Sequence, residues 1–371
     1  MHSTGHPNPK LILWPVAGVL LGVFAVLNPF YAPQISVASG LVCFLVNLVL
    51  ILWLCSSAIG ARIAVLLGGL AMAIPCFLNA KPLERGLLMC LMGLPITFAA
   101  LMIPRPVMPT LRERVAFLCT QLTSGPMKEI PRRFNVFACV QMLVATLVFT
   151  AAMMTVKHTP AQDGWFALRW FAGGVIYLAV AETMTAGHNF WSALTGVNGP
   201  CFFRSPWLAA SVGEFWATRW NLPTSRLLHR NCFALLARHG VWPAVVATFL
   251  LSGVAHFGLA YMAIMKLKLS LLCGLFFCVQ PVLIAIEKNV AVRRWPRIAA
   301  RIWTLAALTV TSPLFVEPSL QIIEPNWGGL DDMIAPATSM IGLVFLFCGI
   351  LALAAVWSHP KFKAEIANVG A

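Results

Sequence analysis

Residues 241–265 read VWPAVVATFLLSGVAHFGLAYMAIM, and none of these 25 positions holds an Asp, Glu, Lys or Arg. A helix of about 20 apolar residues is long enough to cross the hydrocarbon core of a bilayer. One imidazole, that of His256, lies near the middle of this stretch. The stretch therefore predicts a transmembrane helix that carries a polar group at membrane depth.

The composition of the whole chain agrees with this prediction. Of the 371 residues, 60% are apolar and only 10% are charged, whereas a soluble domain carries about 25% charged residues. In lipid the backbone must satisfy its own hydrogen bonds, so a spanning chain is either helical or a closed barrel. Apolar runs of about 17–22 residues suit helices, and they do not alternate as barrel strands do. The sequence predicts an all-α polytopic integral membrane protein.

Hydropathy along the chain predicts about ten transmembrane helices. The candidate spans are residues 11–28, 38–57, 61–78, 87–103, 136–156, 168–187, 241–265, 270–287, 299–316 and 338–357. Because no internal repeat or flexible linker interrupts the series, we expect one domain over residues 1–371.

Basic residues are distributed unevenly between the two sides of this topology. With a cytosolic N-terminus, 20 of the 26 Lys and Arg fall on the cytosolic side, and the outside loop 317–337 is acidic. Cytosolic loops of membrane proteins are enriched in Lys and Arg. We therefore expect both termini in the cytosol, in a bacterial inner membrane or an ER-type membrane. The basic excess suits lipid headgroups, and we do not expect nucleic acid as a partner.

The eleven cysteines show no CxxC spacing and lie mostly inside predicted spans. There a cysteine behaves as a small apolar residue. The sequence therefore predicts neither a disulfide framework nor a metal centre.

Two cytosolic segments, 104–135 and 188–240, are longer than ordinary connections between helices. The first mixes apolar and basic residues, as an interfacial helix does. The second holds five Arg and four Trp. Its Gly- and Pro-rich beginning predicts irregular backbone, followed by a helix from Ser211 that stops near Pro223 and then resumes.

Three arginines of the second segment are spaced to share one helical face. Arg226, Arg230 and Arg238 lie four and eight residues apart. The stripe suits either lipid headgroups or an anionic ligand, such as the phosphates of a nucleotide carrier.

His256 is the only histidine well inside a predicted span. A polar group at membrane depth indicates either function or a hydrogen bond between helices. Ser252 lies one turn away on the same face, and Gly253 and Gly258 permit the close approach of a helix or a ligand. Glu182 is a carboxylate inside a span, where it reaches the interface or pairs with an arginine of the next loop.

Two blocks of sequence carry a resemblance to a known family. SVGEFWATRWN at 211–221 and FLLSGVAHFGL at 249–259 resemble the membrane-bound O-acyltransferase (MBOAT) superfamily, and look most like its wax synthase-like branch. The resemblance covers about residues 200–260 and depends on both blocks, with Asn221 and His256 35 residues apart.

The resemblance implies an acyl-CoA:alcohol O-acyltransferase with His256 as catalytic base and Asn221 as its partner. Phe257 follows the histidine where the plant wax synthase pattern has Glu, so the resemblance does not name the acceptor. The expected residues around acyl-CoA and in support are Trp216, Arg219, Trp220, Arg226 and Arg230, with Ser252 and Glu182.

The implied chemistry needs a base for the hydroxyl and a donor for the tetrahedral oxyanion. His256 suits the first role and the Asn221 amide the second, with acyl-CoA as co-substrate and no other cofactor. If 211–223 lay flat on the membrane surface, Asn221 would be about 20 Å from His256. The mechanism therefore requires this segment to dip into the bundle.

Three other interpretations remain open from the sequence. One is a transporter or flippase with His256 and Glu182 as a proton relay, and another is a receptor or scaffold without chemistry. The third is a polysaccharide O-acetyltransferase acting at the outer face. The sequence indicates neither the oligomeric state nor the acyl length.

Overall fold

The computed structural model describes residues 37–73, 129–159, 164–197 and 201–323, with isolated residues between 82 and 114 and at 348 and 349. The chain divides into two compact units, Met1–Arg114 and Val115–Ala371. Each is considered by itself, and the single domain predicted above stays a prediction. Within the described residues there are helices and one isolated bridge, between Glu129 and Val197, but no strand.

In the first unit, α2 (Val37–Leu54) and α3 (Ala58–Ala73) pack against each other across a tight turn. The hydroxyl of Ser57 accepts a hydrogen bond from Gly60 N at 2.9 Å. A Cβ at Gly60 would clash with the carbonyl oxygen of Leu54. Only glycine fits here, because the first turn of α3 lies directly against the end of α2.

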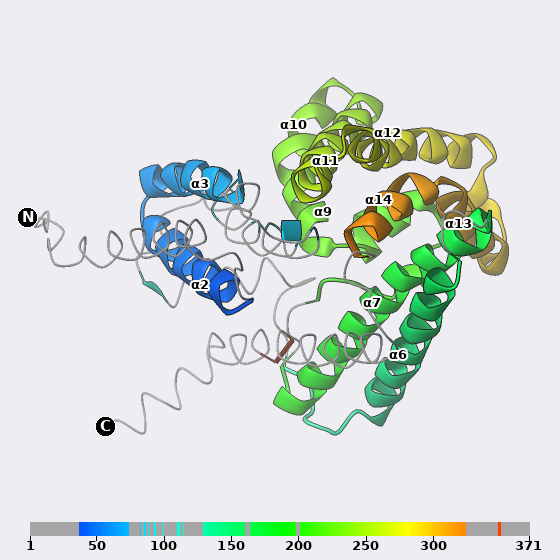
Figure 1. The fold of residues 1–371 in the computed structure, drawn as a ribbon, viewed down its shortest axis with the longest axis horizontal. Helices are drawn as coiled ribbons and strands as arrows, with labels where there is room; N and C mark the ends of the chain where they lie inside the picture. The colour runs from blue at the N-terminus through cyan, green and yellow to red at the C-terminus, as the bar shows by residue number, and fades with distance from the viewer. Residues whose placement is uncertain are drawn as a thin grey trace, which may run out of the picture. The chain divides into compact units, whose positions relative to one another are not determined.

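The second unit begins with a long pair, α6 (Val136–Lys157) and α7 (Phe166–Thr195), which run side by side in Figure 1. Asn135 caps α6 through its Oδ1, which accepts from Ala138 N at 3.1 Å. At its other end α7 stops at Gly196, whose φ of 73° suits a left-handed helix C-cap. Beyond the predicted end at residue 187, α7 continues for two more turns.

A second helix pair consists of α11 (Val241–Ile264) and α12 (Leu267–Asn289). Their backbones meet at two glycines: a Cβ at Gly253 would lie 2.8 Å from Gly274 O, and one at Gly274 would lie 3.0 Å from Gly253 O. Small residues let membrane helices approach this closely. The close approach predicted at Gly253 is confirmed, whereas a Cβ at Gly258 would meet nothing within 4 Å.

The last described element is a bent pair, α13 (Arg297–Thr311) and α14 (Pro313–Ile323), with an angle of 59° at the break. Pro313 has no N–H and its ring clashes with the carbonyl four residues earlier, which favours a kink or a break at this position. The prediction that residues 317–323 belong to an outside loop is wrong. They continue α14, which packs on α7 where Val316 fills the space beside Gly173.

α6, α7 and α14 share an apolar core. It contains Phe149, Met153 and Val156 of α6, Ala172, Ile176 and Ala179 of α7, and Val316 and Leu320 of α14. This core holds α14 against α6 and α7.

A buried ion pair lies beside this core and explains why α14 continues as a helix. Arg169 of α7 is 0% exposed, and its Nε and Nη2 donate to the carboxylate of Glu317 at 3.1 and 3.3 Å. Trp170 Nε1 donates to the same carboxylate at 3.1 Å, and Gln321 Nε2 donates at 3.3 Å.

Replacing Arg169 with Met is expected to destabilise the protein by about 3–5 kcal/mol, because it leaves the Glu317 carboxylate without its cation. The double variant Arg169→Met/Glu317→Gln should recover much of this loss, because the pair is then neutral and Trp170 keeps an acceptor. Thermal unfolding in detergent measures both effects, and Arg297→Met, at an exposed position, is the matched control. A single variant as stable as the control would contradict the prediction.

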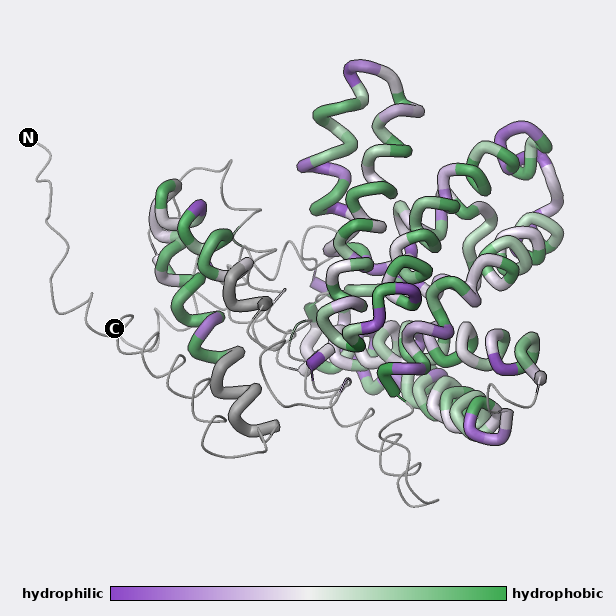
Figure 2. The backbone as a smooth tube through the Cα atoms, turned by 45° about the horizontal axis from the view of Figure 1, so that its top comes forward, coloured by the Kyte–Doolittle hydropathy of each residue, from purple (hydrophilic) through white to green (hydrophobic). Residues whose placement is uncertain are grey.

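The described helices have the surface of a membrane protein. Large apolar side chains face outward, among them Phe137 at 76% and Val310 at 79% exposure. Figure 2 shows hydrophobic residues along the helices of this unit and hydrophilic ones gathered at several of the turns. In lipid this outward apolar surface is favourable.

Four helices, α6, α7, α11 and α12, are long and apolar enough to cross a membrane, and the α13–α14 pair makes five if it is one span. α2 and α3 overlap the spans predicted at 38–57 and 61–78, but their apolar stretches, Leu45–Leu54 and Ile59–Gly69, are shorter than those of these four helices. The spans predicted at 11–28, 87–103 and 338–357 fall outside the described residues, apart from single positions. The polytopic helical class is confirmed, and the count of ten stays a prediction.

Candidate active site

The chain between α7 and α11 forms a series of short helical pieces. They are η4 (Pro206–Leu208), α8 (Val212–Glu214), π-helix η5 (Phe215–Arg219), α9 (Leu222–Leu228), π-helix η6 (His229–Phe233), α10 (Ala234–Leu236) and η7 (Ala237–His239). The helix predicted to begin at Ser211 is confirmed, because the Ser211 hydroxyl caps Glu214 N at 2.9 Å. It breaks at Trp220 and Asn221, and Pro223 lies in the first turn of α9, where a missing N–H is tolerated.

The single α-helix on which the predicted stripe of Arg226, Arg230 and Arg238 depended is not present. The π-helix at 229–233 and the 3-10 turn at 237–239 interrupt the α-helical register on which the prediction depended. Burial, followed by the neighbouring Arg204 guanidinium, lowers the pKa of Arg226. Arg226 therefore lies half-buried beside Arg204, while Arg238 is exposed.

Residues 211–221 are anchored inside the helix bundle by α12 (Leu267–Asn289). Val212 N donates to Glu287 Oε1 at 2.7 Å, and Trp216 Nε1 donates to Gln280 Oε1 at 3.0 Å. Gln280 is 0% exposed. The segment therefore reaches into the bundle, as a shared site with His256 requires.

A second set of contacts fixes the π-helix itself. Arg219 Nε forms an ion pair with Glu214 Oε1 at 2.6 Å, and Arg219 Nη1 donates to Arg204 O at 3.0 Å. Burial opposes ionisation of Glu214, but the N–H of Ala210 and the guanidinium of Arg219 hold its pKa below the usual range. Arg219, expected beside acyl-CoA, instead holds the segment together.

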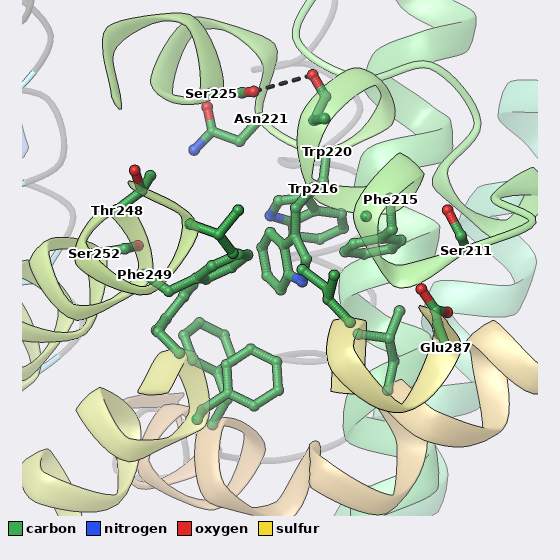
Figure 3. A pocket seen from close by; sticks show the side chains of 18 of the residues that line it. Ser211, Phe215, Trp216, Trp220, Asn221, Ser225, Thr248, Phe249, Ser252 and Glu287 are labelled. Carbon is green, nitrogen blue, oxygen red and sulfur yellow. Dashed lines mark hydrogen bonds between the residues drawn. The ribbon is translucent and has the colours of Figure 1, made fainter. Parts of the chain in front are cut away.

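A cavity of about 1120 Å³ opens between these elements (Figure 3). Its walls come from α7, residues 211–233, α11, α12, η8 (Val292–Arg294) and the α13–α14 pair. Five of the predicted site residues line it, namely Trp216, Trp220, Asn221, Ser252 and His256, whereas Arg219, Arg226, Arg230 and Glu182 do not. Pockets for drug-sized ligands measure about 300–1,000 Å³, so this one is large enough for a long chain.

His256 is held in a defined orientation on the cavity wall. Its Nδ1 lies 2.8 Å from the Ser252 carbonyl oxygen, which can only accept. Nδ1 therefore carries the proton in the neutral ring, and Nε2 is left with its lone pair. The ring stacks on Phe277 at 3.8 Å and meets the edge of Phe315 at 6.0 Å.

Both the backbone conformation of Asn221 and the direction of its side chain suit contact with a ligand. Its φ of 40° lies in the left-handed region, which Asn tolerates better than most residues. Figure 3 shows its amide directed into the cavity, on the side where Thr248 and Ser252 of α11 also lie. Among the described residues this amide has no hydrogen-bond partner, so it is available to a ligand.

One end of the cavity is charged. Glu287, Lys288, Arg293 and Arg294 line it where α12 ends and η8 follows. In the sequence these basic residues indicated only the cytosolic side, because nothing in their spacing links them to His256. They are the functional candidates that the sequence analysis missed.

Glu182 lies apart from this cavity. Its Oε2 accepts from Gln141 Nε2 at 2.6 Å and from Ser205 Oγ at 3.4 Å. The pairing expected with an arginine of the next loop is therefore replaced by an amide of α6 and a hydroxyl. Within the part of the chain that the structure describes, no three His, Cys, Asp or Glu side chains gather to hold a metal ion.

Comparison with known proteins finds relatives for the region of the chain that contains this site. Residues 199–279 match the family model described as the membrane bound O-acyl transferase family. Three proteins of Arabidopsis thaliana are similar, all named as probable long-chain-alcohol O-fatty-acyltransferases. Number 6 is 28% identical over 57% of this chain and 65% of its own length. Number 7 is 28% identical over 41% and 49%, and number 2 is 31% identical over 36% and 42%.

The chain thus spans less than two thirds of the length of each of these relatives. The matched model ends ten residues before α12 does, and it includes both Asn221 and His256. The resemblance seen in the two sequence blocks is confirmed: this part of the chain is similar to the membrane-bound O-acyltransferase superfamily, and the relatives are named as members of its wax synthase-like branch.

Proposed function

We propose that this protein transfers an acyl group from acyl-CoA to a hydroxyl acceptor, with a long-chain alcohol as the acceptor to test first. The observation that carries the proposal is that His256 and Asn221, 35 residues apart in sequence, line one cavity. The relatives' names supply the class of acceptor.

The orientation of His256 supports its role as general base. An alcohol is a poor nucleophile until a base removes its proton. With the proton on Nδ1, His256 Nε2 accepts the hydroxyl proton as the alcohol oxygen attacks the thioester carbonyl. The C–S bond then breaks, and the imidazolium returns the proton to the departing CoA thiolate.

Asn221 supports the same step as a hydrogen-bond donor. The carbonyl oxygen becomes negative in the tetrahedral intermediate, and a preorganised amide N–H stabilises it. The Asn221 amide has no competing partner among the described side chains and points into the cavity (Figure 3). In the proposal it donates to this oxyanion.

The shape of the cavity supports an amphipathic donor. Phe276 and Phe277 near His256 lie about eleven residues from Lys288 on α12, which is about 17 Å along a helix. One end is therefore basic and the region around His256 is aromatic. In the proposal the phosphates of CoA bind near Lys288, Arg293 and Arg294, and the thioester lies beside His256.

Neutralising the basic end is expected to weaken donor binding. The variant Arg293→Gln/Arg294→Gln should raise the KM for acyl-CoA about tenfold, with a smaller change in kcat, because charge-assisted contacts to phosphate are lost. Arg230→Gln, at an arginine outside the cavity lining, is the matched control. Equal KM values for the two variants would place the phosphates elsewhere.

The proposed function is tested with purified protein, a fatty acyl-CoA and a long-chain alcohol. Thiol release and ester formation should be equal and should require both substrates. Replacing the pair by acetyl-CoA and a polysaccharide tests the outer-face acetyltransferase directly. Absence of any ester, or thiol release without ester, would refute the proposal. A proton relay through His256 and Glu182 has no support in the geometry, because Glu182 does not line the cavity.

A further inference from the structure

The cavity continues past His256 into an apolar arm between α7 and α13. Phe171, Gly174 and Leu178 line it on α7, and Leu305 and Leu308 of α13 line it together with Ser312, the residue that follows α13. Each set follows a spacing of three and four residues, so each forms one helical face. Two such faces lying opposite each other enclose a groove, here called the α7–α13 arm.

One aromatic side chain of the cavity wall, that of Phe315, lies between His256 and the α7–α13 arm. The ring of Phe315 lies 6.0 Å from that of His256 and 5.2 Å from that of Tyr177 on α7. Tyr177 also lines the cavity and is one turn from Gly174. A chain that passes His256 therefore reaches the arm directly.

The position of the charged end indicates which substrate places its hydrocarbon chain in the α7–α13 arm. A donor with its phosphates near Arg293 and Arg294 and its thioester at His256 must extend its acyl chain away from the charged end. The arm lies on that side, at the second half of α13, whereas the basic residues precede α13. Its occupant is therefore the hydrocarbon chain of the acyl group.

Gly174 leaves part of this arm empty. A Cβ at Gly174 would meet only Ser312 Oγ, at 4.0 Å, so there is room for a side chain that is not present. At the neighbouring Gly173 the situation is the opposite, because a Cβ would clash with Val316 Cγ1. Gly173 serves helix packing, while Gly174 faces open space in the cavity.

We propose that the α7–α13 arm binds the acyl chain and that Gly174 determines how long a chain it accepts. The inference rests on the proposed acyl transfer and extends it to the specificity of the donor. A larger side chain at position 174 fills the arm from its α7 side and shortens the chain that fits.

The test compares Gly174→Ala and Gly174→Leu with the wild type. Binding is measured with octanoyl, myristoyl and stearoyl thioether analogues of acyl-CoA, which need no turnover, and kcat/KM is measured with the matching thioesters. Each methylene excluded from an apolar site weakens binding about fourfold. Gly174→Leu should therefore lose at least about tenfold in affinity for the stearoyl analogue and change little for the octanoyl one, with Gly174→Ala intermediate.

Gly258→Leu is the matched control, since a Cβ there also meets nothing within 4 Å but the residue does not line the cavity. An unchanged ratio of stearoyl to octanoyl binding in a folded Gly174→Leu or Gly174→Ala protein would overturn the inference. So would a shift in the chain length of the alcohol in place of the acyl group. Binding that follows the expected pattern without ester formation would instead refute the proposed function and leave the arm assigned.

Discussion

Replacing His256 with alanine is expected to lower kcat for ester formation by a factor of about 1,000, within the range of 10²–10⁴ that a general base contributes. The reason is the free lone pair on Nε2, which the hydrogen bond from Nδ1 to the Ser252 carbonyl defines. His229, the other histidine that lines the cavity, stacks on Phe233 and not on Phe277. The measurement is steady-state ester formation by purified protein at saturating acyl-CoA and alcohol.

Two further variants separate chemistry from packing. His256→Gln keeps a side chain of similar length that still donates to Ser252 O, but it cannot accept the proton from the alcohol. It should therefore be as inactive as His256→Ala while retaining the wild-type unfolding temperature. His239→Ala, at an exposed histidine of η7, is the matched control and should keep full activity. Substantial turnover by His256→Gln would exclude His256 as the base.

The spans of the second unit illustrate what hydropathy predicts well. For α6 the prediction was 136–156 against Val136–Lys157, and for α11 it was 241–265 against Val241–Ile264. In both the apolar run ends where the helix ends. The end of α7 was missed because its last two turns, HNFWSALT, mix polar and apolar residues, and a helix inside a protein does not need an apolar sequence to continue. The helix ends at Gly196 because this residue adopts a left-handed backbone conformation.

The site could be predicted only in part for a similar reason. Asn221 and His256 were assigned from a resemblance of two short blocks, and the structure brings both to one cavity. Arg219 was assigned to the ligand because its pairing could not be foreseen. Glu214 and Arg219 lie five residues apart, which does not align side chains on an α-helix but does on a π-helix. The basic end of the cavity could not be predicted from the sequence, because it depends on the tertiary contact between α12 and residues 211–213.

Replacing Asn221 is expected to have the second largest effect. Removing one donor to a developing oxyanion costs a factor of about 10²–10³ in kcat. Asn221→Asp keeps the shape of the side chain but presents oxygens that accept, so it should lose activity at least as severely. The KM for acyl-CoA should change little, because the oxyanion forms only during the reaction.

The backbone of Asn221 allows a sharper version of this experiment. Because its φ is 40°, Asn221→Ala removes the amide and also adds about 1–2 kcal/mol of strain at the junction of η5 and α9. Asn221→Gly removes the same amide without that strain. If the amide acts on the oxyanion, both variants lose activity equally and only Asn221→Ala unfolds at a lower temperature. If Asn221 is there only to permit the left-handed turn, Asn221→Gly keeps wild-type turnover, and the proposed role of its side chain in acyl transfer is refuted.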